Sequence, residues 1–120
     1  QDVMRLLSCG AADLICIKIP KSGLAHASII NAMSETAGVK CTLGSMLPLG
    51  IGAAAIHHFA VAMRNVDVEM GGVYGSPLDY FVDDIVQTST VAKDGAIRLS
   101  DAPGLGDSVD EEKIARYRRQ

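Results

Sequence analysis

Hydrophobic residues alternate between strand-like and helix-like stretches over the first 70 positions. Residues 13–19 (Asp-Leu-Ile-Cys-Ile-Lys-Ile) form a nearly continuous apolar run. Such a run is typical of a strand buried on both faces of a parallel sheet. Pro20 cannot donate a ladder hydrogen bond, so we expect the strand to end there. Residues 39–43 and 66–70 predict a second and a third strand.

Two helices are predicted between these strands. Over 24–36, apolar residues at 29, 30, 33 and 37 follow helical spacing and leave Asn31 and Ser34 outside the stripe. Gly38 suits the end of this helix. Residues 50–63 are Ala-rich and apolar around the whole circumference, so this second helix should be well buried. The order β-α-β-α-β favours parallel strands joined by right-handed crossovers.

The pattern changes after residue 70. Residues 71–75 predict a Gly-rich turn, and residues 77–85 a loop or short helix. Residues 87–92 and 96–99 predict a hairpin, because Asp94-Gly95 between them suits a type I′ turn. Asp110 can cap a last helix over 111–118, which carries acids first and bases last.

Composition excludes several classes of protein. The chain has 120 residues, 48% of them hydrophobic, which predicts one folded domain rather than disorder. Eleven basic and fourteen acidic residues give 11 − 14 = −3, and Trp is absent, so a nucleic-acid binder is disfavoured. Pro48 and His57–His58 interrupt the longest apolar stretch, so we expect no membrane span. Three cysteines without CxxC spacing favour reduced thiols, and hence a cytoplasmic protein.

Three parallel strands with two helices do not cover their own edges. The first residues also resemble the tail of a preceding helix. We therefore expect the chain to be the C-terminal piece of a longer one. The alternative is a small α/β domain that closes by pairing with a second copy.

Candidate chemistry gathers where the three predicted strands end. Lys18, Ser45 and Glu69 follow successive strands, at the sheet edge where α/β proteins build their sites. A lysine in an apolar strand is costly unless it reaches a polar site, although its stem can also snorkel to water. Asp67 and Glu69 share one face of the third predicted strand. Lys18 and Glu69 are thus either a general acid–base pair or a structural ion pair.

Other motifs support rival interpretations. Residues 50–55 (Gly-Ile-Gly-Ala-Ala-Ala) resemble a GxGxxA dinucleotide loop, although close helix packing explains Gly50 and Gly52 equally well. A small nucleotide-binding module and a non-catalytic, self-associating domain are the two alternatives. The adjacent histidines at 57 and 58 favour packing or surface roles, His26 should be exposed, and Cys16 and Cys41 should be core cysteines.

Several short motifs together resemble a known family. They are Ile17–Gly23 (IKIPKSG), Gly44–Leu47 (GSML), Val68–Gly71 (VEMG), and Pro103–Gly106 (PGLG) with Asp110-Glu111. In order and spacing they resemble the C-terminal part of the enolase superfamily, within the mandelate racemase/muconate lactonizing enzyme family and nearest to its muconate cycloisomerase subgroup. The resemblance implies the end of a (β/α)₇β TIM-like barrel. Residues 1–86 would be the last three strands and their helices. Residues 87–120 would be the hairpin and terminal helix, returning toward a capping domain.

The resemblance also implies an activity. Enzymes of this family remove the proton α to a carboxylate of a small molecule and stabilise the enolate on Mg²⁺. Lys18 matches an acid/base lysine and Lys21 the second lysine of the same KxxK motif. Glu69 matches a glutamate at the end of the last barrel strand. The loop of Ser45, Met46 and Leu47 matches one that lines the substrate pocket, and Asp67 is a further substrate-binding candidate.

The resemblance also sets limits. The family's metal carboxylates lie on earlier strands, so the Mg²⁺ ligands are expected outside these residues. Pro48 stands where the cycloisomerases usually have Glu, and Asp67-Val-Glu69 only partly matches the Asp-x-Asp of dipeptide epimerases. We expect an isomerase or lyase that acts within a longer chain and forms a homo-oligomer.

Overall fold

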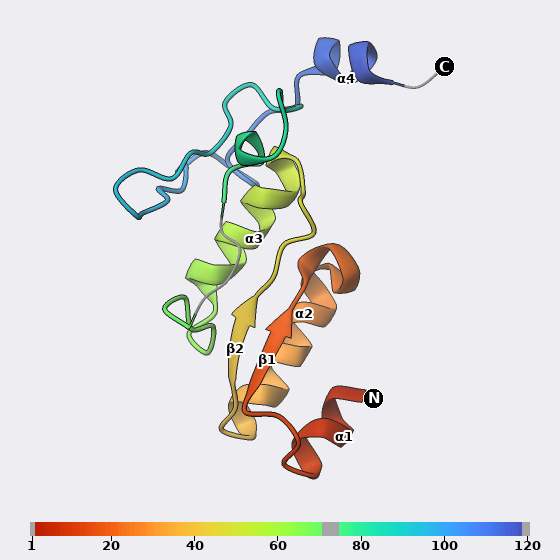
Figure 1. Cartoon of the computed structure of the whole chain (residues 1–120), viewed down its shortest axis with the longest axis vertical. Helices are drawn as coiled ribbons and strands as arrows, with labels where there is room; N and C mark the ends of the chain where they lie inside the picture. Colours follow the sequence, from red (N-terminus) through yellow and green to blue (C-terminus); the bar gives the residue numbers. More distant parts are fainter. Residues whose placement is uncertain (1, 71–74, 119–120) are drawn as a thin grey trace.

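Two parallel strands and two long helices form the centre of the molecule (Figure 1). The computed structural model describes residues 2–70 and 75–118. Strand β1 (Leu14–Ile17) leads into α2 (Ile19–Thr36), and β2 (Lys40–Leu43) is followed by α3 (Gly50–Ala62). The strands pair in parallel, with Leu14 opposite Lys40 and Ile17 opposite Leu43. This βαβ unit is the expected one, and its strand and helix bounds over residues 39–63 match the prediction to within one residue.

Shorter elements lie at the two ends of the long axis. Helix α1 (Asp2–Ser8) lies beside the beginning of β1, while α4 (Glu111–Tyr117) lies at the opposite end (Figure 1). A 3₁₀ turn, η1 (Pro77–Asp79), follows α3, where a loop or short helix was predicted. The radius of gyration is 15.7 Å. A compact domain of this length has about 14 Å, so the chain is extended for its size.

One face of the strand pair carries the hydrophobic core. Ile17 of β1 and Leu43 of β2 are almost fully buried, as are Ala27 of α2 and Ile56 and Phe59 of α3. Each large side chain among these contributes roughly 1.5–3 kcal/mol on burial. The other face of β1 is not covered: Cys16 is exposed. The expectations that β1 is buried on both faces and that Cys16 is a core cysteine are therefore wrong for this chain, because the core cluster occupies only one face of the pair.

Strand β1 ends earlier than Pro20. The backbone carbonyl of Lys18 accepts hydrogen bonds from the N–H groups of Lys21 (2.9 Å) and Ser22 (3.1 Å). These bonds turn the chain into a helical turn directly after Lys18, and Pro20 lies inside that turn. Gly23 then breaks the helix with φ 68° and ψ 167°, so the main part of α2 begins at 24, as the sequence predicts. Lys18 therefore directly follows the end of β1, and the rest of the KxxK segment is the first turn of α2.

The buried face of α2 differs from the predicted stripe. Ala27, Asn31 and Ser34 are buried, whereas Ile29 is 54% exposed. The three buried residues also follow i, i+4, i+7 spacing. Of the predicted stripe, Ile30 packs half-buried against the core, whereas Ile29 and Ala37 are exposed. On β2, burial raises the pKa of the neighbouring Cys41 thiol.

The third predicted strand is reduced to one bridge. Val66 pairs in parallel with Cys41, and the Asp67 N–H donates to the Cys41 carbonyl (2.7 Å). The Asp67 carboxylate then accepts from the N–H groups of Glu69 (3.0 Å) and Met70 (3.2 Å). This local competition for backbone donors bends the chain away from the sheet. The prediction of a strand over 66–70, with Asp67 and Glu69 on one face, is therefore wrong.

The segment after residue 75 is mostly irregular. Asp94 and Gly95 both have positive φ (52° and 75°), which confirms the type I′ turn. The arms of the predicted hairpin pair only at Lys93–Ala96, and the long loop is closed at its base by a Val86–Val109 bridge. The cap of α4 is confirmed, since the Asp110 carboxylate accepts from the Lys113 N–H (3.0 Å). Of the predicted Gly-rich turn, residues 71–74 lie outside the described residues.

A buried carboxylate holds α3 to this segment. Asp84 is 2% exposed, and its Oδ1 accepts from the N–H groups of Gly50 (2.8 Å) and Ile85 (2.7 Å). Its other oxygen accepts from the Ser89 hydroxyl. Because Gly50 is the first residue of α3, the charge lies at the positive end of the helix dipole.

None of the helices in the described part of the chain is long and apolar enough to cross a membrane.

We expect Asp84→Ala to destabilise the protein by about 1–3 kcal/mol, because it leaves buried N–H groups without an acceptor. Gly50→Ala should cost a similar amount by overpacking, because a Cβ there would lie 2.5 Å from Val86 and 2.7 Å from Asp84. Denaturant unfolding measures both. Asp101→Ala, at an exposed position, is the control and should stay within about 0.5 kcal/mol. An unchanged stability in Asp84→Ala would contradict this account of the α3 terminus.

A second prediction concerns the docking of α4. A hydrogen bond from Lys113 (2.8 Å), helped by the Asp84 N–H and the Tyr117 hydroxyl, lowers the pKa of Asp83 from 3.8 to about 2. A lowered carboxyl pKa stabilises the fold above the unfolded pKa, and that stability is lost as the pH falls toward 2. We therefore expect α4 to loosen between about pH 4 and pH 2. NMR titration of the Asp83 carboxyl should give a midpoint near 2, and Lys113→Met should raise it. A midpoint that Lys113→Met leaves unchanged would show that the ion pair does not set the pKa.

Candidate functional site

Lys18 lies where β1 ends and α2 begins. Its side chain is half-buried, and its Nζ donates a hydrogen bond to the carbonyl of Ser45 (3.3 Å). The Gly44 N–H donates to the Ile17 carbonyl (2.8 Å), which extends the parallel pairing one residue beyond the strands. The two strand ends therefore meet side by side. The structure brings Lys18 and Ser45 together, as their places after successive strands predict.

The loop after β2 presents apolar side chains beside this point. Met46 is 52% and Leu47 50% exposed, while Ser45 is half-buried. The Leu47 N–H donates to the Ser45 hydroxyl (3.4 Å), and Leu47 has a positive φ of 53°. A left-handed conformation is uncommon outside glycine and costs about 1–2 kcal/mol. Such strain is found at functional sites more often than elsewhere.

The remaining candidate residues are spread more widely. Lys21 is exposed on the first turn of α2, held to Lys18 by its backbone hydrogen bond. Asp67 is half-buried and Glu69 is exposed on the turn that Asp67 stabilises. Within residues 2–70 and 75–118, no ion pair joins Glu69 to Lys18. The structure therefore does not assemble the predicted Lys18–Glu69 pair in this chain, because the strand that would carry Glu69 is not formed.

The three histidines differ in burial. His57 is buried in α3, while the half-buried His58 ring lies 3.2 Å from the Leu105 carbonyl and His26 is exposed. These are the packing and surface roles that the sequence favours. In the described part of the chain, no group of three or more His, Cys, Asp or Glu residues could hold a metal ion.

The dinucleotide interpretation does not fit the start of α3. The Asp84 carboxylate already accepts the Gly50 N–H, so the position that a pyrophosphate needs carries a negative charge. The space beside Gly50 is filled by Val86, and that beside Gly52 by Pro48. Both glycines are therefore explained by close packing, and a nucleotide-binding module is excluded at this loop.

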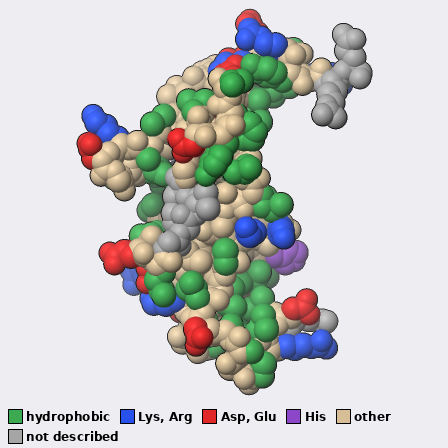
Figure 2. Space-filling model, in the orientation of Figure 1, with side chains coloured by type: hydrophobic (Ala, Val, Ile, Leu, Met, Phe, Trp, Pro, Cys, Tyr) green, Lys and Arg blue, Asp and Glu red, His purple; other side chains and the backbone are tan. Residues whose placement is uncertain are grey.

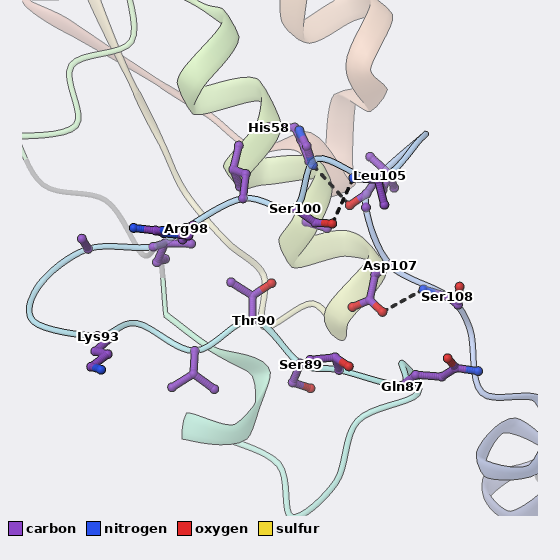
Figure 3. Close-up of a pocket in the computed structure, with 18 of the residues that line it drawn as sticks. His58, Gln87, Ser89, Thr90, Lys93, Arg98, Ser100, Leu105, Asp107 and Ser108 are labelled. Atoms are coloured by element: carbon purple, nitrogen blue, oxygen red, sulfur yellow. Dashed lines mark hydrogen bonds between the residues drawn. The ribbon is translucent and has the colours of Figure 1, made fainter.

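A large hollow lies away from the candidate residues. The long loop over 87–108 surrounds a space of about 1370 Å³ against α3 (Figure 3). His58, Lys93, Arg98 and Asp107 line it together with several serines and threonines. It exists because the arms of the predicted hairpin stand apart. None of the seven candidate residues lines it, so it is not part of the candidate site.

Sequence reasoning missed two residues that shape the site. Gly44 lies beneath the Lys18 side chain, and Asp84 anchors the loop that carries Ser45, Met46 and Leu47 by holding its far end at Gly50. The sequence feature that could have pointed to Gly44 is its position between a predicted strand and the candidate substrate loop. For Asp84 the signal was an acid directly before the apolar pair Ile85-Val86.

Comparisons with known proteins agree with this geometry. The family model for the enolase C-terminal domain-like family matches residues 1–113. L-Ala-D/L-Glu epimerase of Bacillus subtilis (strain 168) is 34% identical over 107 residues, covering 88% of this chain and 28% of the epimerase. Muconate cycloisomerase 1 of Pseudomonas putida is 31% identical over 121 residues, covering all of this chain and 32% of that enzyme. The chain therefore spans about a third of the length of these relatives.

The solved structures give the same result. Muconate lactonizing enzyme from Pseudomonas putida superposes with a TM-score of 0.88 at 28% identity, covering 98% of this chain and 32% of that enzyme. The similar structures are TIM-barrel enzymes of the enolase superfamily, which confirms the expected fold class of a C-terminal α/β portion of such a barrel. With a parallel strand pair, two packed helices and a matching family model over nearly the whole chain, this protein belongs to the enolase C-terminal domain-like family, within the mandelate racemase/muconate lactonizing group of the enolase superfamily.

Proposed function

We propose that these residues form part of an enzyme that removes the proton α to the carboxylate of a small molecule, leading to epimerisation, racemisation or cycloisomerisation. The relatives are epimerases, cycloisomerases and o-succinylbenzoate synthases, which supports an isomerase or lyase. The observation that carries the proposal is the position of Lys18. Its Nζ lies at the C-terminal end of β1, held by the carbonyl that begins the Ser45–Leu47 loop. In barrels this is the end where catalytic residues are found.

In this proposal Lys18 is the general acid/base on one side of the substrate. As a neutral amine it takes the α-proton, and the C–H electron pair stays on the carbon as part of an enolate. Return of a proton from the resulting ammonium to the same side, after exchange with solvent, gives α-proton exchange with retained configuration; a proton delivered to the opposite side gives the epimer, and Lys18 then loses its proton to solvent. Epimerisation needs a second acid/base on the opposite side, and we place that group outside these residues.

The neighbouring residues orient the substrate. Exposed Met46 and Leu47 offer an apolar surface to a substrate side chain. Lys21, one helical turn from Lys18, offers a positive charge to a substrate carboxylate. Asp67 and Glu69 supply negative charge beyond the Val66 bridge, suited to a cationic group on the substrate.

We propose that the enzyme is Mg²⁺-dependent, with the metal ligands elsewhere in the full protein. Bound Mg²⁺ neutralises charge on the substrate carboxylate. The described residues do not include a set that fits the ion, so no step above is routed through it.

We also propose that residues 1–86 complete a barrel and that residues 87–120 contact its cap. Hydrophobic side chains gather on the visible face in several patches (Figure 2). Among exposed side chains are Phe81, Val82 and Val61. Patches of this kind mark surfaces that other parts of a protein cover. A cytoplasmic location and a homo-oligomeric state stay predictions.

Lys18→Ala in the full-length protein should abolish exchange of the α-proton with solvent deuterium from the Lys18 side. Proton NMR in D₂O would follow L-Ala-L-Glu, L-Ala-D-Glu, a hydrophobic dipeptide and muconolactone. The wild type should exchange at least one of them. Lys40→Ala is the matched control, since Lys40 lies on β2 at the opposite end of the strand pair. Unchanged exchange of both epimers in Lys18→Ala would rule the proposal out.

The acidic turn gives a separate prediction. Glu69→Gln should lower kcat/KM for a cationic substrate by about tenfold, which corresponds to 1.4 kcal/mol. Asp67→Asn keeps an oxygen that accepts the Glu69 and Met70 N–H groups, whereas Asp67→Ala does not. Activity that survives Asp67→Asn but not Asp67→Ala would assign Asp67 to holding the turn. Equal loss in both variants would instead mean that the Asp67 charge itself binds substrate.

A further inference from the structure

Gly44 and Lys18 occupy neighbouring places on the face of the strand pair that lies opposite the hydrophobic core. The register pairs Cys16 with Thr42, and the hydrogen bond from the Gly44 N–H to the Ile17 carbonyl continues it. Because side chains of a parallel ladder at matching positions lie on the same face, Cys16, Lys18 and residue 44 share one face. Residue 44 is therefore the position whose side chain would meet Lys18.

The Lys18 side chain fills the space that a side chain on residue 44 would take. A Cβ on Gly44 would lie 3.0 Å from Lys18 Nζ, 3.2 Å from Lys18 Cε and 3.0 Å from Cys16 Sγ. From this place the ammonium reaches the Ser45 carbonyl at 3.3 Å. The Lys18 side chain thus passes over Gly44 to reach its acceptor, the carbonyl of Ser45, in the loop after β2.

Glycine is needed at position 44 because a side chain would not fit there, and not because the backbone adopts a conformation that only glycine favours. Gly44 is buried, but it is not among the glycines with positive φ, so alanine can adopt its backbone. The atoms that a methyl group would crowd are the end of a flexible lysine and one thiol. A methyl group would therefore displace the ammonium by a few tenths of an ångström while leaving the strand pairing intact.

We infer that Gly44 is a positioning residue for the proposed reaction: its missing side chain lets the Lys18 amine lie over the end of β2, bonded to the Ser45 carbonyl. This inference rests on the proposed function, in which Lys18 exchanges the α-proton. Reaction geometry is sensitive to small displacements, since misplacing a catalytic group by about 1 Å costs about a hundredfold in rate. A side chain on residue 44 that displaces the Lys18 amine should therefore lower the reaction rate without unfolding the protein.

The test uses the full-length protein and the substrate of the panel above that exchanges its α-proton. Gly44→Ala should lower kcat for exchange from the Lys18 side by about two- to fivefold, the share of the hundredfold loss per ångström that a displacement of a few tenths of an ångström carries, with little change in KM. Exchange from the opposite side should be retained. A merely structural role would lower both sides together, and that result would overturn the inference.

Two further variants separate the causes. Gly95→Ala is the control, because Gly95 has a φ of 75° and a Cβ there would have open space around it. Gly95→Ala should lower Tm through backbone strain and leave α-proton exchange unchanged. Gly44→Ala should instead lower the exchange rate and leave the fold intact. In Cys16→Ala/Gly44→Ala the thiol crowding is relieved and only Lys18 remains displaced, so the one-sided loss should persist. Full recovery in that double variant would show that crowding of Cys16 was responsible and would refute the role assigned to Gly44.

The outcomes also distinguish this inference from the proposed function. If Lys18→Ala leaves exchange from both sides intact, the proposed function fails. If Lys18→Ala abolishes one-sided exchange while Gly44→Ala does not lower it, the function stands and the inference about Gly44 fails.

Discussion

The parallel pairing of β1 with β2 is the contact on which the rest of this structure depends. It aligns Ile17 with Leu43 on the covered face, where α2 and α3 supply the remaining core residues. It also aligns Lys18 with Gly44 at the open end through the hydrogen bond from the Gly44 N–H to the Ile17 carbonyl. A slip of β1 against β2 by one residue would move Ile17 out of the core and Lys18 away from the Ser45 carbonyl. The stability of the core and the geometry of the candidate site therefore both depend on the hydrogen bonds between β1 and β2.

The close packing around that ladder comes from small residues. Ala27, Asn31 and Ser34 form the buried face of α2, and α3 contributes Ala55 beside Ile56. Ile56 and Phe59 of α3 are buried with them, while other large apolar residues of the two helices face outward. Ile29 on α2 and Val61 on α3 are examples. In the proposed full enzyme these outer surfaces are where other parts of the protein make contact.

The loop that carries the candidate substrate residues is held at both ends. At its beginning, the Ser45 carbonyl binds Lys18, and at its end the Gly50 N–H binds the buried Asp84 carboxylate. Between these anchors, Leu47 adopts a positive φ. A short loop fixed at two points can hold a strained residue that a free loop would relax. The same carboxylate that supports this loop also occupies the start of α3, which is why the glycine-rich motif there binds no phosphate in our interpretation.

Much of the fold could be predicted from the sequence because it depends on local patterns. The apolar run before Lys18, the Ala-rich stretch over 50–62, the Asp-Gly turn and the Asp110 cap each carry their own signal within a few residues. The order of the short motifs likewise identified the family that the comparisons confirm. The third strand failed because Asp67 captures the N–H groups of Glu69 and Met70, a competition that hydrophobic periodicity does not register. The buried face of α2, the exposure of Cys16 and the place of the Lys18 amine over Gly44 were decided only by tertiary structure, because each depends on which surfaces meet across the chain and not on the residues beside it in sequence.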